Sequence, residues 1–408
     1  MLNEVQCINN EVIFMERISN LEKQYVMEAL ENEFATSKNS IFNNKLEKEF
    51  ANKFHSKYAI GHCNGTSTLH VALLSCGVGE GDEVIVPPLT MSSTSIPIVL
   101  CGAIPVFADC DLNTFQISAD SIEKCITDKT KAIITVSLYG LAPDYDKILE
   151  ICKKYDLILI EDNAECFLGE YKGKLVGEFG DFASYSFQAS KHITTGEGGM
   201  LTTNNKELAD KARQFNCLGY AGVSAEEGKI TKNDIQDPKY NRHVSFGYNY
   251  RMSELQAACA LGQLERAEDL VQNRIEVANI FDEVIECQNI LKRQFEPKGY
   301  KNSYWAYCLV LDSNNPSKDW YTFRDLFQKN GGDNYYAAWK LSYNEPAYQN
   351  ILQKQFNVWQ KYDENCCPNA EYLQKRMIQL KTNYWDIEEA KEQANILKKT
   401  IDEYEICK

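Results

Sequence analysis

The sequence lacks several features that would assign it to large classes of proteins. None of its 15 cysteines belongs to a Cys-x-x-Cys pair and its five histidines are scattered, so the usual spacing of zinc ligands is missing. The longest apolar run, Ile96 to Ala108, is interrupted by Pro97 and Pro105 and is too short to cross a bilayer. The start, Met1-Leu-Asn-Glu, has neither a basic segment nor an apolar core, so we expect no signal peptide. We therefore expect a cytoplasmic protein with reduced thiols.

Positive charge is also scarce. The chain has 43 Lys and Arg against 58 Asp and Glu, and its net charge of −15 argues against a general nucleic-acid or anionic-membrane binder. A ligand with a phosphate group would have to be held by local donors. What is present is ordinary for a globular protein: 408 residues, 44% hydrophobic and 25% charged, are enough for a large core and two domains.

One lysine stands in an apolar and glycine-rich setting, Ser186-Phe-Gln-Ala-Ser-Lys191-His-Ile-Thr-Thr-Gly-Glu-Gly-Gly199. The stretch begins as a strand and ends in a turn that lets backbone pass close to a bound group. Phe187 and Ile193 flank Lys191, so we expect the amine to point into a lined pocket. Desolvation there favours the neutral amine, a nucleophile that forms a Schiff base with a carbonyl. The alternative is an ordinary lysine at the end of a strand.

A second segment, Leu157-Ile-Leu-Ile-Glu-Asp162, is an apolar run that ends in two carboxylates. This pattern predicts a buried parallel strand with Asp162 at its carboxyl end, where ligand sites lie in open α/β sheets. Pyridoxal phosphate (PLP) needs a lysine for its aldehyde and a carboxylate for its pyridinium nitrogen. Lys191 and Asp162 together therefore point to PLP.

A third segment, Asn64-Gly65-Thr66-Ser67, lies between a short strand and an amphipathic helix. Its N–H groups and hydroxyls at the helix N-terminus could hold a phosphate. The alternative is an ordinary helix cap. His70, inside that helix, is expected to pack.

Strands and helices alternate along most of the first half of the chain, which predicts a mainly parallel sheet with helices on both faces. A helix from Ser253 to about Glu283 leads from a large domain, residues 1–265, to a small α+β domain, residues 266–408. The polar segment 219–241 is either a lid over the pocket or a plain insertion. The expected strands are 83–86, 105–109, 132–136, 157–161 and 182–187, and the expected helices between and after them are 118–126, 146–154 and 206–215.

Taken together, these segments resemble the DegT/DnrJ/EryC1/StrS family of PLP-dependent sugar aminotransferases, from about residue 30 to the C-terminus. Each marker is weak alone, but all occur in the family's order with suitable gaps. The markers are Asn64-Gly-Thr-Ser-Thr-Leu-His, Ile160-Glu-Asp162-Asn-Ala-Glu165, Ser186-Phe-Gln-Ala-Ser-Lys191, Thr195-Gly-Glu-Gly-Gly and Gly247-Tyr-Asn249-Tyr-Arg-Met-Ser-Glu-Leu-Gln-Ala.

The resemblance implies a fold type I (aspartate aminotransferase-like) homodimer with its active sites at the subunit interface. Lys191 would be the Schiff-base residue and the proton shuttle, and Asp162 would pair with the pyridinium nitrogen. Asn249 would reach the phosphate of the neighbouring subunit's cofactor. Glu165 would lie near the phenolic oxygen, and the phosphate would be held by Ser186, Gly65, Thr66 and Ser67.

Two positions depart from the common family pattern. Many members have glutamine or histidine where this chain has Glu165, although the perosamine-synthase-like branch commonly has glutamate. A carboxylate there must share a proton or a hydrogen bond. Many members stack an aromatic ring on the cofactor where this chain has Met91, whose thioether can also cover a π-face.

The expected activity is transfer of an amino group from L-glutamate to a keto sugar, with a GDP-linked 4-keto-6-deoxyhexose as the first expected substrate, for surface polysaccharide or glycan synthesis. Two alternatives stay open, a PLP-dependent sugar dehydratase and a non-catalytic PLP-binding regulator. The dehydratase branch has histidine at the position of Lys191, so lysine there favours amine transfer. The regulator is disfavoured by the intact lysine–aspartate pair and the lack of a basic DNA-binding segment.

Overall fold

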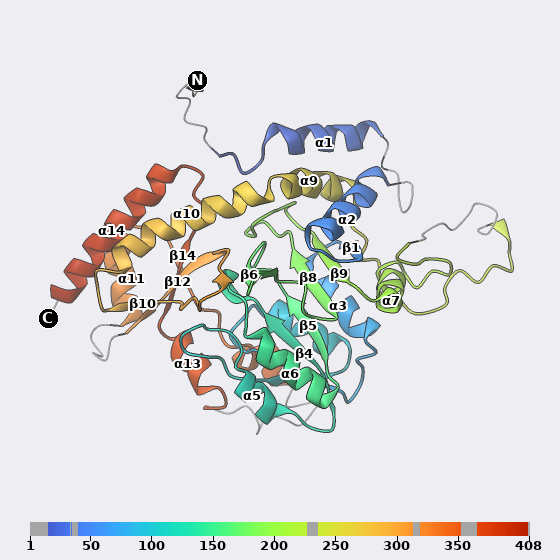
Figure 1. The fold of residues 1–408 in the computed structure, drawn as a ribbon, viewed down its shortest axis with the longest axis horizontal. Helices are drawn as coiled ribbons and strands as arrows, with labels where there is room; N and C mark the ends of the chain where they lie inside the picture. Colours follow the sequence, from blue (N-terminus) through green and yellow to red (C-terminus); the bar gives the residue numbers. More distant parts are fainter. Residues whose placement is uncertain are drawn as a thin grey trace, which may run out of the picture.

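A seven-stranded sheet lies at the centre of the computed structural model, which describes residues 15–32, 34, 40–226, 236–312, 319–351 and 365–406 (Figure 1). The strand order is β1-β9-β8-β5-β4-β2-β3. All neighbours pair in parallel except β9, which is antiparallel to both β1 and β8. The mainly parallel sheet is thus confirmed. Its strands are β1 (Tyr58–His62), β2 (Glu83–Val86), β3 (Ile104–Phe107), β4 (Thr130–Val136), β5 (Ile158–Asp162), β8 (Phe182–Ser186) and β9 (Gly199–Thr203).

Helices cover both faces of this sheet, as alternation along each strand requires. In β2, Val84 and Val86 belong to one hydrophobic core and Ile85 to another. The first core contains side chains from α3 (Gly65–Ser75), α4 (Ile96–Leu100) and α7 (Lys206–Asn216), and the second contains side chains from α5 (Ala119–Cys125) and α6 (Tyr145–Tyr155).

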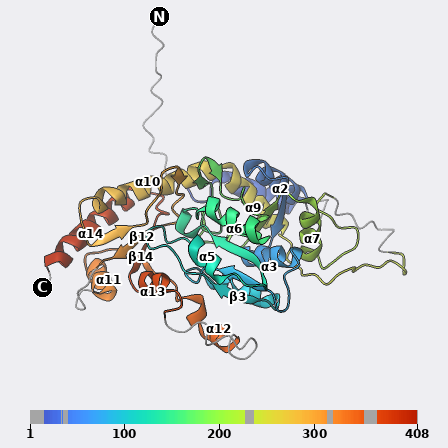
Figure 2. The same cartoon turned by 60° about the horizontal axis from the view of Figure 1, so that its bottom comes forward.

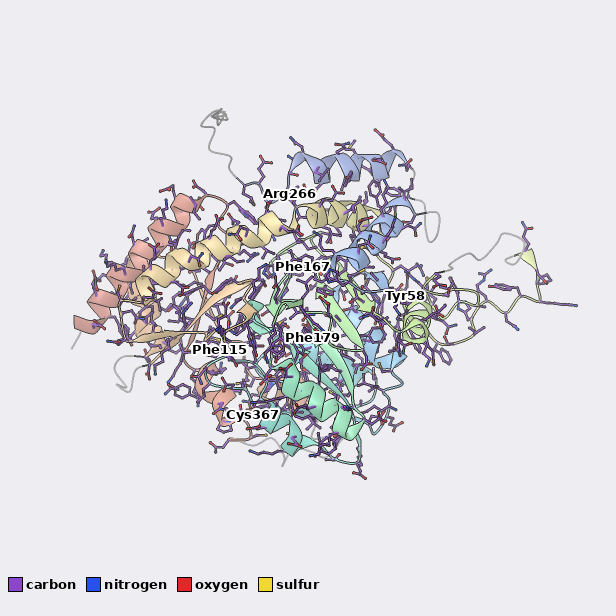
Figure 3. All side chains as sticks on the ribbon, in the orientation of Figure 1. Tyr58, Phe115, Phe167, Phe179, Arg266 and Cys367 are labelled. Carbon is purple, nitrogen blue, oxygen red and sulfur yellow. The ribbon has the colours of Figure 1, made fainter. Side chains whose placement is uncertain are left out.

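A third core lies beneath the lysine segment, between the sheet and the helices α1 (Asn20–Glu31), α2 (Ile41–Lys53) and α9 (Glu254–Glu265). Aromatic rings fill it: Phe54 packs edge-on against Phe167, which Figure 3 labels, with ring centroids 5.0 Å apart. Phe187 and Ile193, on either side of Lys191, are buried in the same core. The segment that carries the lysine is therefore anchored at both ends by apolar burial.

A four-stranded antiparallel sheet lies toward the C-terminal end, in the order β10-β12-β14-β13. Long helices pack on it around a fourth core (Figure 1). These elements are β10 (Leu291–Arg293), β12 (Ala306–Leu311), β13 (Tyr336–Ala337), β14 (Met377–Lys381), α10 (Ala267–Ile285), α11 (Trp320–Lys329) and α14 (Ile387–Ile406).

Shorter elements connect the two sheets. Two short strands form a hairpin around residue 173 and pair with a third strand far along the chain, so the three form a small sheet of their own. These elements are β6 (Glu170–Tyr171), β7 (Lys174–Leu175), β11 (Tyr300–Lys301), α12 (Pro346–Ile351), α13 (Pro368–Gln374) and the 3-10 turns η2 (Ser92–Thr94), η3 (Leu138–Gly140) and η4 (Ser342–Asn344).

The single helix expected from Ser253 to about Glu283 is wrong, because the structure breaks it at Arg266 into α9 and α10. Arg266, labelled in Figure 3, has φ −109° and ψ 10°, outside the helical range. Its guanidinium donates to Glu22 of α1 at 2.7 Å. The sequence at the break contains neither glycine nor proline. The contact with Glu22 joins residues far apart in the chain, so the local sequence does not predict the break.

The segment after α7 extends beyond that helix, away from both sheets (Figure 2). Of the expected loop 219–241, residues 227–235 lie outside the described part, so its role as a lid stays a prediction. Across the described ranges, no helix combines the length and apolar content needed to span a bilayer.

Candidate active site

Asp162 is the last residue of β5 and is buried, with 3% of its surface exposed. Its carboxylate accepts hydrogen bonds from the Thr94 hydroxyl at 2.9 Å and from the Ala164 N–H at 3.1 Å. Burial raises the pKa of Asp162, while these two hydrogen bonds and the charge of Lys191 oppose the shift. The prediction that the apolar strand delivers this carboxylate to its carboxyl end is confirmed.

Lys191 lies in the irregular segment between β8 and β9, and 14% of its side chain is exposed. Its Nζ is 3.3 Å from Oε1 of Glu165 and lies 4.5 Å from the ring centroid of Trp305. A carboxylate and an aromatic face thus hold the ammonium from two sides. The amine is in a lined site, although its partners are not the apolar neighbours in sequence, which pack in the core.

Glu165 is buried on the same short segment as Asp162 and accepts a further hydrogen bond from the backbone N–H of Tyr139 at 3.3 Å. Burial raises its pKa, and the positive charge of Lys191 is the largest effect in the opposite direction. The strand end therefore brings two buried carboxyl groups and one lysine together.

The glycine-rich start of α3 lies beside the end of β8. The register pairs Ser186 with Gly199 and Gly199 with His62, so the chain that continues into Gly65 runs past Ser186. A Cβ on Gly65 would lie 2.9 Å from the Cβ of Ser186, closer than side chains tolerate. Glycine at this position thus lets the backbone at the N-terminus of α3 lie directly against Ser186, and the free N–H groups of a helix N-terminus favour an anion.

The neighbouring hydroxyl of Ser67 points back into its own helix and donates to the Asn64 carbonyl at 2.7 Å. Asn64 in turn caps the Ser67 N–H at 2.8 Å, as in an ordinary helix cap, and the predicted contact of Ser67 with a phosphate stays a prediction. Thr66, half-buried one residue earlier, stays a predicted phosphate ligand. His70 is buried, as expected, and its ring packs against Tyr248.

Met91 and Asn249 lie farther out. Met91 is 49% exposed and precedes the turn η2, whose Thr94 contacts Asp162, so its thioether is on the solvent side of that contact. Asn249 is exposed and pairs with Cys217 in an isolated β-bridge. Their predicted contacts with a cofactor stay predictions.

Thr94 and Trp305 were not predicted as site residues. Thr94 follows β2, which is separated from β5 by β4, and the carboxyl ends of all parallel strands of a sheet share one edge, so that signal was available. Trp305 comes from the start of β12 in the other sheet, more than 100 residues from Lys191. Only the fold brings it to the amine.

These groups fit pyridoxal phosphate. Among the ion pairs of the described residues none involves Asp162, so this buried carboxylate has room for a cationic N–H partner of the kind a pyridinium ring offers. Lys191 supplies the amine for the aldehyde. The N-terminus of α3, where glycine lets the backbone lie against Ser186, would hold the phosphate, and this role stays a prediction.

Comparison with known proteins agrees with this arrangement. The model of the DegT/DnrJ/EryC1/StrS aminotransferase family matches residues 16–397. A GDP-perosamine synthase of Escherichia coli O157:H7 is 41% identical over 298 residues, which are 73% of this chain and 77% of that protein. The X-ray structure of an aminotransferase from Psychrobacter cryohalolentis has a TM-score of 0.83 and 29% identity, and covers 95% of this chain and 97% of its own.

A further solved protein, from Streptococcus pneumoniae, has a TM-score of 0.81 at 24% identity, covers 95% of this chain and 97% of its own, and was obtained in its PLP form. At that identity it supports the fold alone, which is that of the fold type I PLP enzymes. The family match and the residues at the carboxyl edge of the sheet lead to one conclusion. The chain belongs to the DegT/DnrJ/EryC1/StrS family and is a PLP-dependent aminotransferase.

Proposed function

We propose that the enzyme moves an amino group from L-glutamate to a nucleotide-linked keto sugar, with a GDP-linked 4-keto-6-deoxyhexose as the first candidate. The observation that carries the proposal is the Lys191 amine, held between the Glu165 carboxylate at 3.3 Å and the Trp305 ring at 4.5 Å beside the buried Asp162. The relative at 41% identity is named as a GDP-perosamine synthase, which supports this class of acceptor.

When bound, PLP supplies an aldehyde and a ring that accepts electrons from the reacting carbon. Lys191 Nζ would move the proton between that carbon and the cofactor, because among the described residues it is the one basic side chain in contact with both Glu165 and Trp305. Asp162 would keep a ring N–H protonated from its buried position. Glu165, which accepts a hydrogen bond from Lys191, would hold the amine in place while the proton moves.

An aromatic surface next to Lys191 supports a sugar as the acceptor. Trp305, Tyr139 and Trp339 have mutual ring-centroid distances of 5.8 to 6.3 Å and interplanar angles of 11 to 28°. Tyr139 is fully buried, whereas Trp305 and Trp339 are only partly buried, so the two tryptophans are the rings against which the C–H face of a deoxy sugar can pack. An acceptor whose carbonyl reaches Lys191 has to lie near this surface.

A homodimer with shared active sites is part of the proposal. Asn249 would reach the phosphate of the partner's cofactor from the exposed segment after α7. Phe246, three residues earlier, is 98% exposed, and a fully exposed phenylalanine is favourable only once another surface covers it. We also propose a cytoplasmic location, which the thirteen free cysteines of the described ranges support.

Visible absorbance tests the first half of the reaction. The purified protein is mixed with PLP and its spectrum recorded before and after L-glutamate alone. We expect the band of the lysine-linked cofactor to disappear with formation of one equivalent of 2-oxoglutarate. An unchanged band would mean another amino donor, and the absence of the band would refute the role of Lys191.

Product analysis with the GDP-linked keto sugar tests the second half. An aminotransferase should form amino sugar and 2-oxoglutarate in equal amounts. A dehydratase should release ammonia instead.

A further inference from the structure

A fully buried arginine lies directly behind the catalytic lysine. Arg274 of α10 is 1% exposed, and among the described residues it forms no ion pair with a carboxylate. Its Nε is buried without a hydrogen-bond partner in the same set of residues. Burial lowers the pKa of Arg274 to about 9, so the side chain still carries its charge at neutral pH. An uncompensated buried charge is costly, which calls for an explanation of why arginine stands here.

The two terminal nitrogens of Arg274 serve two different parts of the molecule. One donates to the backbone carbonyls of Ser190 at 3.3 Å and Lys191 at 3.2 Å. The other donates to the carbonyl of Trp305 at 2.9 Å and the hydroxyl of Thr382 at 3.0 Å. A planar guanidinium can reach both pairs at once, whereas the single nitrogen of a lysine cannot.

The segment on the first side depends on such anchors. Lys191 lies outside any helix or strand, so no ladder of backbone bonds fixes it. The Ser190 carbonyl receives a second donor, the indole N–H of Trp305 at 3.0 Å, and the Thr382 hydroxyl donates to the Tyr304 carbonyl at 2.6 Å. Arg274 is the common partner that links the backbone of Lys191 to the residue whose ring covers its amine.

Helix α10 passes from one core to another near this residue. Leu270 and Val271 are buried in the core beneath the lysine segment, whereas Val277 and Ala278 are buried in the core of the four-stranded sheet. Arg274 lies between these pairs. One terminal nitrogen of its forked guanidinium bonds the lysine segment and the other bonds residues next to the four-stranded sheet. A shift of that sheet against the large sheet would therefore act on both nitrogens.

We infer that Arg274 is a positioning residue that fixes Lys191 Nζ relative to Glu165 and Trp305 and couples this geometry to the four-stranded sheet. The inference rests on the aminotransferase chemistry of the site and not on the identity of the sugar. A misplaced amine costs rate because the barrier depends on the approach geometry, and about 1 Å can cost on the order of 100-fold.

Two substitutions separate geometry from charge. R274K keeps the charge and loses the fork, and R274M loses both. R266M, at the residue that precedes α10 and contacts Glu22, is the control for loss of a partly buried arginine. For each variant we would measure the melting temperature, the rate at which Lys191 links to added PLP, the pH midpoint of the visible band, and kcat and KM for the glutamate half-reaction.

For R274K we expect PLP linkage and kcat to fall about 10- to 100-fold with KM for glutamate within about threefold. For R274M we expect an additional rise in the pH midpoint of the band, because removal of a neighbouring positive charge favours the protonated form. R266M should lose melting temperature only.

A purely structural role predicts the opposite pattern. If R274K and R274M lower the melting temperature but link PLP at the wild-type rate and midpoint, the inference is wrong. If neither variant folds, T382V replaces them, because it removes one acceptor of the fork at nearly constant volume. It should slow PLP linkage by a smaller factor, and unchanged linkage would overturn the inference.

Discussion

Two regions of the molecule differ in how many of their contacts come from the same chain. They are the pocket around Lys191 and the segment 236–250, which we call the arm. In the pocket, Asp162 and Glu165 are buried and each has at least two hydrogen-bond partners from the same chain. In the arm, Phe246 is 98% and Val244 58% exposed. The pocket is thus held by its own chain, whereas the arm presents two apolar side chains, Val244 and Phe246, that nothing in the described structure covers.

The root of the arm is nevertheless well fixed. The N–H of Tyr248 donates to the Phe215 carbonyl at 2.7 Å, and the rings of Tyr248 and Tyr250 stack with centroids 5.0 Å apart. A fixed backbone that carries exposed apolar side chains is the arrangement expected of a segment that docks on another molecule. The comparison therefore separates catalytic groups, which one chain positions, from contacts for which we propose a second copy.

The largest expected effect comes from the pocket. K191A should abolish turnover, a loss of at least about 10⁴-fold, because no other amine touches Glu165 and Trp305 among the described side chains. Formation of 2-oxoglutarate from L-glutamate measures it. K211A, on the exposed face of α7, is the control and should keep wild-type turnover. Sustained turnover by K191A would remove the basis for the proposed function.

The next effect contrasts two adjacent carboxylates of β5. D162N keeps the shape of the side chain but removes the charge that would pair with the ring nitrogen, and should lower kcat about 10²- to 10³-fold. Glu161 points the other way and accepts N–H bonds from Gly177, Phe179 and Gly180 at 2.6 to 2.8 Å.

E161Q is therefore the matched variant with the opposite profile. Its amide can accept fewer of these bonds, so we expect it to cost about 1–3 kcal/mol of unfolding free energy and little kcat per folded molecule. Denaturant unfolding and kcat, measured on both proteins, check the contrast. Equal losses of kcat would contradict the assignment of Asp162.

Mixing of variants tests the arm. N249A alone should weaken PLP binding about tenfold, and F246S should shift the protein toward monomer in sedimentation experiments.

If sites are shared, co-expressed N249A and K191A chains form mixed dimers in which one of the two sites is intact. At a PLP concentration well below that needed to saturate N249A, activity of the mixture above that of either variant alone is the expected result. No recovery, with dimers present, would mean that each chain completes its own site.

These residues also show which parts of the site and the fold can be predicted from the sequence alone. Asp162 and Lys191 were predictable because each is adjacent in sequence to the strand that positions it. Trp305 and Arg274 were not, since their contacts with the lysine segment join residues more than 80 positions apart. The break at Arg266 was missed for the same reason. Local patterns reveal strand ends, whereas the packing of two sheets decides which side chains meet there.

The smallest expected effect concerns the protonation of Glu165 and the pH dependence of stability that follows from it. Burial raises the pKa of Glu165, so the folded chain binds its proton more tightly than the unfolded chain does. The contribution to stability is full below the ordinary pKa of 4.5 and is lost as pH rises through the higher folded value. E165Q does not titrate, so its unfolding free energy without cofactor should rise relative to wild type over that window. Chemical unfolding from about pH 4.5 to pH 8 measures the difference.

In a K191A background the gain in unfolding free energy should be larger, because Lys191 is the charge that opposes the raised pKa of Glu165. A difference that does not depend on pH would show that the lysine already keeps Glu165 ionised, and the pocket would then hold a fixed ion pair.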